Sequence, residues 1–302
     1  MPELPEVETT TKGLKETILG LKIKSVWTDL NTKDKRQSEA VANSKYFLYF
    51  KKEVLNKKIL SVERKAKNIL INLSGEKTIL IHMKMTGHLL YGKYKFFEKE
   101  NKWKPIENNA LSDPYNRFIH FVFILSNNKH LAFSDTRKFG KITLLDTKIA
   151  HISKHLKNIG IDPLNKDLNP KRLEKILKKK PNGKIKTILM DQTILAGIGN
   201  IYSDEILWET SIHPERKISN IKQIEFKNIF KAMIKILSEG IDFGGDSMSD
   251  YRNIHGEKGK FQLHHRVYRR KGKKCNKKGC FGIIVRKIIG GRSAHFCPVH
   301  QK

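Results

Sequence analysis

Hydrophobic residues in the first half of the chain recur in short runs separated by Gly, Asn, Ser and Asp. Runs of this length, rich in Ile, Leu and Phe, are typical of β-strands. Within residues 79–85, the odd-numbered side chains from Ile79 to Met85 are expected on one face and the even-numbered ones on the other. Several such strands predict a β-sandwich or barrel. The expected strands are 69–73, 79–85, 118–125, 130–133 and 141–145.

A helix is expected before these strands, because Val7, Leu14 and Ile18 are spaced along one face. Pro5 suits its first turn, and Gly20 can end it.

The second half of the chain changes to a helical period. Asn169 and Pro170 are typical of a cap and a first helical residue. A glycine turn at 196–200 precedes a helical stretch at 201–210. A further helix is expected to end at Gly240, on the spacing of Phe226, Ile229, Phe230, Met233 and Leu237. Residues 244–259 are polar and glycine-rich and indicate a mobile loop, and a domain boundary is expected near His151.

Charge adds a functional constraint to this pattern. The 302 residues contain 60 Lys+Arg and 30 Asp+Glu, a formal net charge of +30, and no acidic residue lies between Lys258 and Lys302. Such an excess favours phosphate backbones through Coulomb attraction and counterion release. Lysine scattered over solvated faces is the alternative, but it explains an acid-free tail poorly. No apolar run approaches the roughly 20 residues of a membrane span, and no secretory signal is seen at the N-terminus.

The three cysteines indicate a metal site rather than disulfides. Cys275, Cys280, Cys297 and His300 form two close pairs separated by a hairpin-length segment. Thiolates and imidazole in this spacing suit tetrahedral zinc, and four protein ligands make the zinc structural. Its role would be to fold a small basic hairpin without a core of its own. His295 is a competing ligand, and free thiols are the alternative.

The N-terminus holds a second candidate site. Removal of Met1 would expose Pro2 as a secondary amine, whose pKa is expected near 8 and far below that of lysine. At the positive end of a helix, the Glu3 carboxylate is favoured and a protonated amine is not. An amine nucleophile beside a carboxyl group can attack an anomeric carbon while handling a proton. Alternatively, these residues merely begin a helix.

Together the motifs resemble the formamidopyrimidine-DNA glycosylase family. The similarity runs in the family's order through MPELPEVETT, SVERKAKNILINL, IHMKMTGHL, SDTRKFGKI, LMDQTILAGIGNIYSDEIL, SIHP, GEKGKFQLHHRVYRRKG and GGRSAHFCPVH. The resemblance implies a multidomain α+β fold. Its parts would be an N-terminal β-sandwich with flanking helices (1–150), a helix–two-turns–helix domain (151–262) and a C-terminal zinc finger (263–302).

The resemblance also implies site residues. Pro2 would attack C1′ of the damaged nucleotide and form a Schiff base, with Glu3 as its acid–base partner. Lys67 matches a lysine implicated in base loss and β-elimination. Arg292 matches an arginine that grips phosphate and serves δ-elimination. Further positions match residues that contact DNA. Three of them fill the void left by the extruded nucleotide (Met85, Arg137 and Phe139), and two lie near phosphates (Lys186 and Asn200).

The implied protein is a cytoplasmic monomer. It would hold one structural zinc ion and need no small-molecule cofactor. Its partner would be damaged double-stranded DNA, and no membrane is involved.

Alternation alone would place Met85 in the core beside Ile79 and Ile81. The chain departs from the family at His300, where a cysteine is usual, in a longer segment at 91–114, and at Ser249 in the loop that covers the lesion. A histidine that often contacts DNA is missing near Phe118, where Arg117 or His120 could replace it. An oxidised-pyrimidine glycosylase of the same fold and a non-catalytic zinc-finger binder of damaged DNA are the alternatives.

Overall fold

The computed structural model describes all 302 residues, which divide into two compact units. The first comprises residues 1–157 and 243–260, and the second comprises residues 158–242 and 261–302. The chain therefore leaves the first unit, folds much of the second, returns for 18 residues and leaves again. None of the helices is long and apolar enough to span a lipid bilayer.

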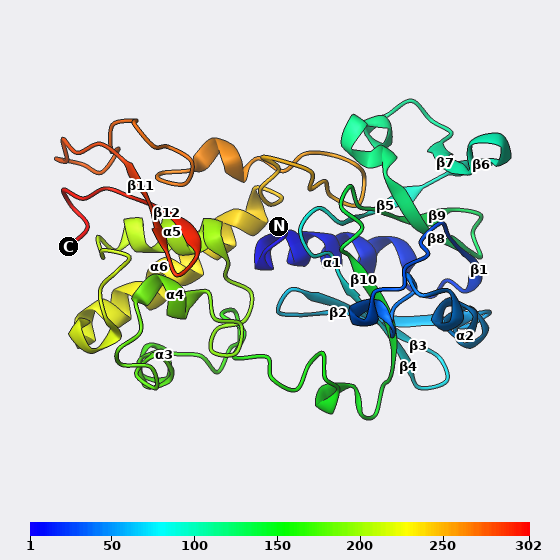
Figure 1. The fold of residues 1–302 in the computed structure, drawn as a ribbon, viewed down its shortest axis with the longest axis horizontal. Coiled ribbons are helices and arrows are strands. Elements are labelled where there is room, and N and C mark those ends of the chain that lie inside the picture. The colour runs from blue at the N-terminus through cyan, green and yellow to red at the C-terminus, as the bar shows by residue number, and fades with distance from the viewer. The chain divides into compact units, whose positions relative to one another are not determined.

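The first unit is a β-sandwich, as the strand pattern predicts (Figure 1). One antiparallel sheet has the order β1-β8-β9-β5 and the other the order β10-β4-β3-β2. The first sheet consists of β1 (Ile23–Thr28), β8 (Ile119–Leu125), β9 (His130–Ser134) and β5 (His88–Gly92). The second consists of β10 (Lys141–Asp146), β4 (Lys77–His82), β3 (Asn68–Leu73) and β2 (Ile59–Lys65).

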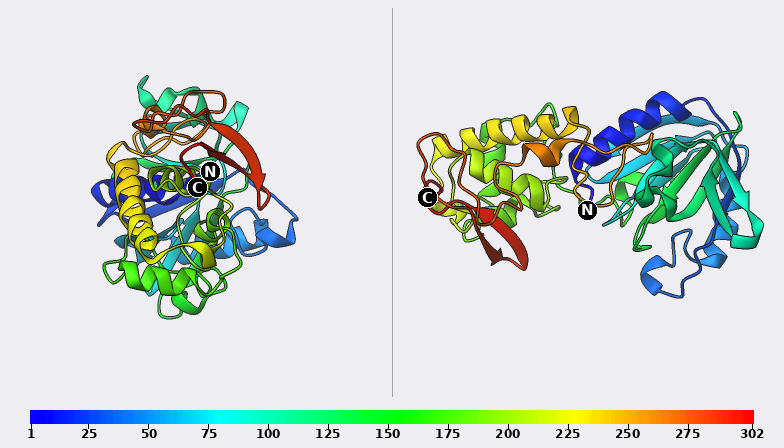
Figure 2. Two further views of the ribbon diagram at one scale, coloured as in Figure 1. Left: turned by 90° about the vertical axis from the view of Figure 1, so that its left-hand side faces the viewer. Right: turned by 90° about the horizontal axis from the view of Figure 1, so that it is seen from above.

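The sandwich encloses one large apolar core, to which helices contribute. Helix α1 (Leu4–Ile18) buries Val7, Leu14 and Ile18 and is followed by Gly20 at φ +79°, as expected. Helix α2 (Ser44–Val54), which the sequence pattern did not reveal, adds Phe50 and Val54. Figure 2 shows α1 lying along the strands of this unit.

Met85 is not a strand residue, contrary to the alternation argument. Strand β4 ends at His82, and Lys84 adopts a left-handed backbone conformation at φ +55°. This turn breaks the alternation, so Met83 is buried while Met85 has 41% of its surface exposed.

The segment 91–114 folds as a hairpin over an apolar patch. Strands β6 (Tyr94–Phe97) and β7 (Lys102–Pro105) pair with each other, and Trp103 lies edge-on to Trp27 of β1 with ring centroids 6.1 Å apart. A buried cluster of Leu90, Tyr94, Leu111, Ile119, Val122 and Ala132 lies beneath. The hairpin thus supplies this sheet with a second, smaller core.

The glycine-rich segment 243–260 is anchored rather than free. Tyr251, Arg252 and Ile254 are buried, and Ile254 belongs to the sandwich core. A Cβ at Gly13 of α1 would lie only 2.4 Å from Ile254, so the helix approaches the segment through a glycine. Exposed residues lie at the tip, where Met248 has 42% of its surface accessible, and again at His255, Glu257, Lys258 and Lys260.

The second unit is helical with a terminal hairpin, in agreement with the sequence. It contains α3 (Pro170–Leu177, capped by Asn169), α4 (Ile185–Leu189), α5 (Asn200–Glu209), α6 (Gln223–Asp242), β11 (Val285–Ile289) and β12 (Arg292–Phe296). Gly240 does not end α6, because the helix continues to Asp242 with Gly240 buried inside it. The hairpin extends from the helices of this unit in Figure 2.

Candidate functional site

The N-terminus of α1 buries the candidate catalytic pair. Pro2 is buried, and Glu3 is the N-cap residue with 2% of its surface exposed. Glu3 forms a capping box with Glu6, whose Oε2 accepts the Glu3 amide proton at 2.7 Å. The other Glu6 oxygen accepts the Asp246 amide at 2.8 Å. Glu6, which the sequence analysis did not single out, therefore joins the start of α1 to the segment 243–260.

The turn that carries Lys67 is tied to the same helix. Lys67 follows Ala66 between β2 and β3 and has 6% of its surface exposed. The Arg64 guanidinium donates from Nε to Glu8 of α1 at 2.5 Å and from Nη1 to the Ala66 carbonyl at 3.2 Å. The arginine side chain of this ion pair is only slightly exposed, so the pair fixes the position of the turn relative to α1, which Glu3 caps.

His82 is a further polar residue of this region that the sequence analysis missed. Burial, together with the positive charges of Lys84 and Lys67, lowers the pKa of His82 to about 3. Its Nδ1 accepts the Lys84 amide at 3.0 Å, so the neutral ring carries its proton on Nε2. A neutral N–H donor near the positive charges of Lys84 and Lys67 is suited to an anionic ligand. The signal in the sequence was a polar residue at a strand end, between Ile81 and Met83.

Met85, Arg137 and Phe139 come together on the surface of the first unit. The Arg137 guanidinium lies 4.6 Å from the Phe139 ring centroid, and its Nη1 lies 3.1 Å from the Met85 sulfur. Met85 and Phe139 are 41% and 48% exposed. Two exposed apolar side chains beside a guanidinium form a surface suited to contact with a partner. The group borders a cavity of about 780 Å³ that is also lined by Arg36, Lys84, Lys138 and Lys141.

Asp135 organises the loop that presents this cluster. It is buried, and its carboxylate accepts the amides of Arg137 at 3.2 Å and Gly140 at 2.6 Å, as well as the Thr86 hydroxyl. Thr86 is adjacent to Met85, so one carboxylate joins both segments of the cluster. A Cβ at Gly140 would collide with Phe133 at 2.3 Å. The sequence signal was an Asp two residues before the arginine, which is typical of an Asx turn.

In the second unit, Lys186 does not lie where a phosphate contact requires it. The side chain is fully buried, and its Nζ donates to Asp204 at 2.5 Å and to Ser203 at 3.2 Å. The second Asp204 oxygen accepts the backbone amide of His295 in β12 at 2.9 Å. The structure thus places Lys186 in a buried ion pair with Asp204, and the expectation that it lies near a DNA phosphate stays a prediction.

Arg292 and Asn200 lie at a hairpin turn and at a helix start. Arg292 begins β12, directly after the turn Gly290–Gly291, and is exposed. A Cβ at Gly290 would lie 2.4 Å from Thr187, so only glycine lets the hairpin approach α4 this closely. Asn200 is the first residue of α5, and its Oδ1 is buried with no hydrogen-bond partner. Backbone amides at a helix start favour anions.

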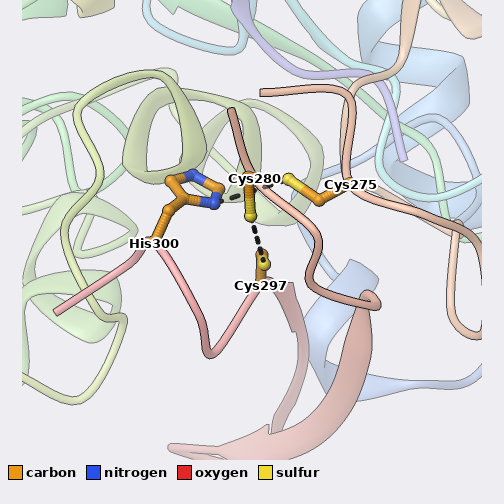
Figure 3. Close-up of side chains that lie close together, drawn as sticks. All are labelled: Cys275, Cys280, Cys297 and His300. Carbon is orange, nitrogen blue, oxygen red and sulfur yellow. Dashed lines mark hydrogen bonds between the residues drawn. The ribbon is translucent and has the colours of Figure 1, made fainter. Parts of the chain in front are cut away.

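Cys275, Cys280, Cys297 and His300 gather as their spacing predicts (Figure 3). Their ligand atoms lie within 4.8 Å of one another. The Cys280 and Cys297 sulfurs are 3.6 Å apart, and the Cys275 sulfur is 3.4 Å from Nδ1 of His300. Tetrahedral zinc with bonds of about 2.3 Å to sulfur and 2.05 Å to nitrogen requires separations of roughly 3.8 and 3.6 Å. The donor set therefore fits a metal ion of this kind.

Neighbouring groups orient these ligands. Nε2 of His300 faces the Trp208 carbonyl oxygen at 3.3 Å, which leaves Nδ1 as the lone pair aimed at the cluster. The Trp208 indole N–H donates to the Cys275 sulfur at 3.3 Å. His295, the competing ligand, is instead buried with its Nδ1 3.2 Å from Asp204. The fourth member of the cluster is therefore His300 rather than His295.

Comparison with known proteins identifies this combination of sandwich, helical unit and finger. The model of the formamidopyrimidine-DNA glycosylase N-terminal domain matches residues 1–142, and the H2TH domain model of the same family matches residues 159–252. The formamidopyrimidine-DNA glycosylases of Pelotomaculum thermopropionicum and Streptococcus mutans are 37% and 36% identical to this chain. Both alignments cover 100% of this chain, with 99% and 100% of the relatives covered.

Solved structures of proteins with this fold lead to the same family. A complex between the Lactococcus lactis Fpg and DNA containing an abasic site superposes with a TM-score of 0.82 at 30% identity over 99% of each chain. A variant of that protein bound to DNA containing Fapy-dG gives the same TM-score over 100% of each chain. The fold and site are those of a DNA glycosylase of base-excision repair. The chain belongs to the formamidopyrimidine-DNA glycosylase family.

Proposed function

We propose that this protein excises oxidised purines, 8-oxoguanine and formamidopyrimidines, from duplex DNA and cuts the strand at the resulting abasic site. The observation that carries the proposal is the burial of Pro2 and Glu3 at the start of α1, in a unit that also holds Lys67 and the surface cluster of Met85, Arg137 and Phe139. A protein that only binds DNA has no need of an amine beside a carboxylate.

The chemistry requires Met1 to be removed, so that Pro2 presents a secondary amine. Its nitrogen attacks C1′, the bond from C1′ to the damaged base breaks, and opening of the sugar ring yields a Schiff base between Pro2 and the former C1′. Glu3 handles the protons of these steps. Lys67 assists base loss and β-elimination of the 3′ phosphate, and Arg292 holds phosphate for the δ-elimination that leaves a one-nucleotide gap.

Base extrusion sets the second requirement. A glycosylase reaches its target by flipping the nucleotide out of the stack at a cost of a few kcal/mol. Met85 and Phe139 are apolar wedges that replace the lost stacking, and the Arg137 guanidinium hydrogen-bonds the orphaned base. Their mutual contacts in the protein arrange them for joint insertion. Asn200 is proposed to contact a phosphate at the start of α5.

We further propose that Cys275, Cys280, Cys297 and His300 hold one structural zinc ion. When bound, it would fold the finger that presents Arg292. No position is left open for a reacting group, since all four ligands come from the protein. The proposed enzyme acts as a monomer in the cytoplasm, on the chromosomal DNA that its positive charge favours.

Borohydride trapping on a duplex containing 8-oxoguanine tests the assignment. We expect a covalent adduct on Pro2 in a chain that lacks Met1. Peptide mapping that finds Met1 retained, or the adduct on Lys67, would overturn it. Glu3→Gln should lose excision of the intact lesion more than cleavage of a ready-made abasic site. A duplex with thymine glycol tests the preference for oxidised pyrimidines, which the comparisons do not favour.

A further inference from the structure

The segment 91–114 and the loop tip at Met248–Asp250 are joined by one buried arginine. Arg252 has 1% of its surface exposed. Its Nη1 donates to the carbonyl oxygens of Ser249 and Tyr251, both at 2.9 Å, and so spans the loop tip. Its Nη2 donates to the two carboxylate oxygens of Asp113 at 3.1 and 3.3 Å. The tip therefore takes its shape from a group whose counterion lies on a distant segment.

The Asp113 carboxylate is held in its charged form at this position. Burial raises its pKa, but the hydrogen bonds from the Tyr115 amide and from Arg252 outweigh burial and lower it. The Arg252 guanidinium also stacks 4.7 Å from the Tyr115 ring centroid. One Arg252 nitrogen thus reaches both oxygens of the Asp113 carboxylate, and this charge-assisted contact sets the position of the guanidinium.

A second connection runs in parallel through Asn116. This side chain is 1% exposed and donates from Nδ2 to the carbonyls of Ala110 at 2.9 Å and Gly256 at 3.2 Å. Its Oδ1 faces Nε2 of His88 in β5 at 2.9 Å. Gly256 has φ +86°, and a Cβ there would lie 2.6 Å from the Ala110 carbonyl. The end of the segment 91–114 is thus packed directly against the base of the loop.

We propose that Asp113 is a positioning residue that acts through Arg252 to shape the loop tip beside the buried start of α1, where Asp246 of the same loop binds Glu6, and that it governs base excision but not strand cleavage. The proposal rests on the proposed function. In the proposed reaction an intact lesion presents a base that the tip can contact at this site. In an abasic site no base is present, so the shape of the tip has no consequence for the Schiff-base and elimination steps. This assigns a role to the segment 91–114 in choosing the substrate.

The test compares two single-turnover rates for each variant of the full chain, on a duplex with 8-oxoguanine and on one with a ready-made abasic site. Asp113→Ala should slow excision about ten- to a hundredfold, since displacement of a positioning element by about 1 Å can cost a hundredfold. Cleavage of the abasic duplex should keep its rate. Arg252→Met should show the same selective loss, and the double variant should be no worse, because both act on one contact.

Two further variants control for loss of activity caused by misfolding. Asp113→Asn retains an acceptor for the Tyr115 amide, which caps the short helix Pro114–Arg117, and should show a smaller loss in the same direction. Glu100→Ala removes a carboxylate that pairs only with Lys104 in the same hairpin and should leave both rates unchanged. Equal losses in both rates for Asp113→Asn, or no loss, would overturn the proposal. A wild-type protein that acts on neither duplex would instead overturn the proposed function.

Discussion

The finger and the surface cluster of the sandwich both gather functional side chains, but by opposite means. The four candidate metal ligands lie within one segment of 26 residues, between Cys275 and His300. Met85 and Arg137 are 52 residues apart, and a carboxylate that is part of neither group, Asp135, holds their segments together. Local spacing therefore suffices to define the finger, whereas the cluster exists only because the sandwich folds.

Removing the metal should give the largest effect and should break the finger alone. Structural zinc contributes about 10–16 kcal/mol to the folding of small zinc modules. Cys297→Ala or chelation should abolish metal binding and unfold the hairpin that carries Arg292, with loss of DNA affinity. Elemental analysis and DNA titration measure both. His300→Cys is the matched control and should retain the metal. Affinity that survives chelation would contradict the assignment.

The second largest effect is expected from breaking the buried ion pair between Lys186 and Asp204. Lys186→Met leaves Asp204 without its cation and should lower the free energy of unfolding by about 3–5 kcal/mol. Arg292→Ala removes an exposed guanidinium and should leave stability unchanged, while lowering the salt slope of DNA binding by about one unit. Denaturant melts and salt titrations separate the two. If both variants had the same free energy of unfolding, Lys186 would be a surface contact rather than a buried structural residue.

Asp135 offers the corresponding test in the sandwich. Asp135→Ala leaves the buried amides of Arg137 and Gly140 without their acceptor, at a cost of about 1–3 kcal/mol. The cluster should lose its shape, so that excision of an intact lesion slows while metal content is unchanged. Thr86→Val is a milder variant that keeps the Asp135 carboxylate but removes the hydroxyl that donates to it and accepts the Arg137 amide. Wild-type excision by Asp135→Ala would show that the cluster holds together without its carboxylate.

The smallest effect is expected at the turn that carries Lys67. Ala66 has φ +57°, a conformation that costs an L-residue roughly 1 kcal/mol. Ala66→Gly should relieve this strain and, after the greater chain entropy of glycine, raise the free energy of unfolding by about 0.5 kcal/mol. Ala232→Gly within α6 is the control and should lower it. A loss of stability in Ala66→Gly would show that the turn is not strained.

These cases show which features the sequence could predict. The strands, α1 and the metal cluster follow from patterns that operate over a few residues, and the structure confirms them. The exposure of Met85 and the burial of Lys186 do not follow from such local patterns. The alternation through Met85 ended at a turn whose position depends on Lys84, and the burial of Lys186 depends on Asp204 in another helix. Glu6 and Asp135 were missed because their partners lie in segments that only the fold brings near.

The route of the chain has a consequence for dissecting the protein genetically. Residues 243–260 fold with the first unit although they follow most of the second in sequence. A fragment ending at Lys157 would lack Ile254, leave Gly13 of α1 facing an empty space, and lose the Asp246 partner of Glu6. Neither unit is thus a contiguous stretch of gene, so a stop codon or a single exchange of segments between relatives cannot transplant one without damaging the other.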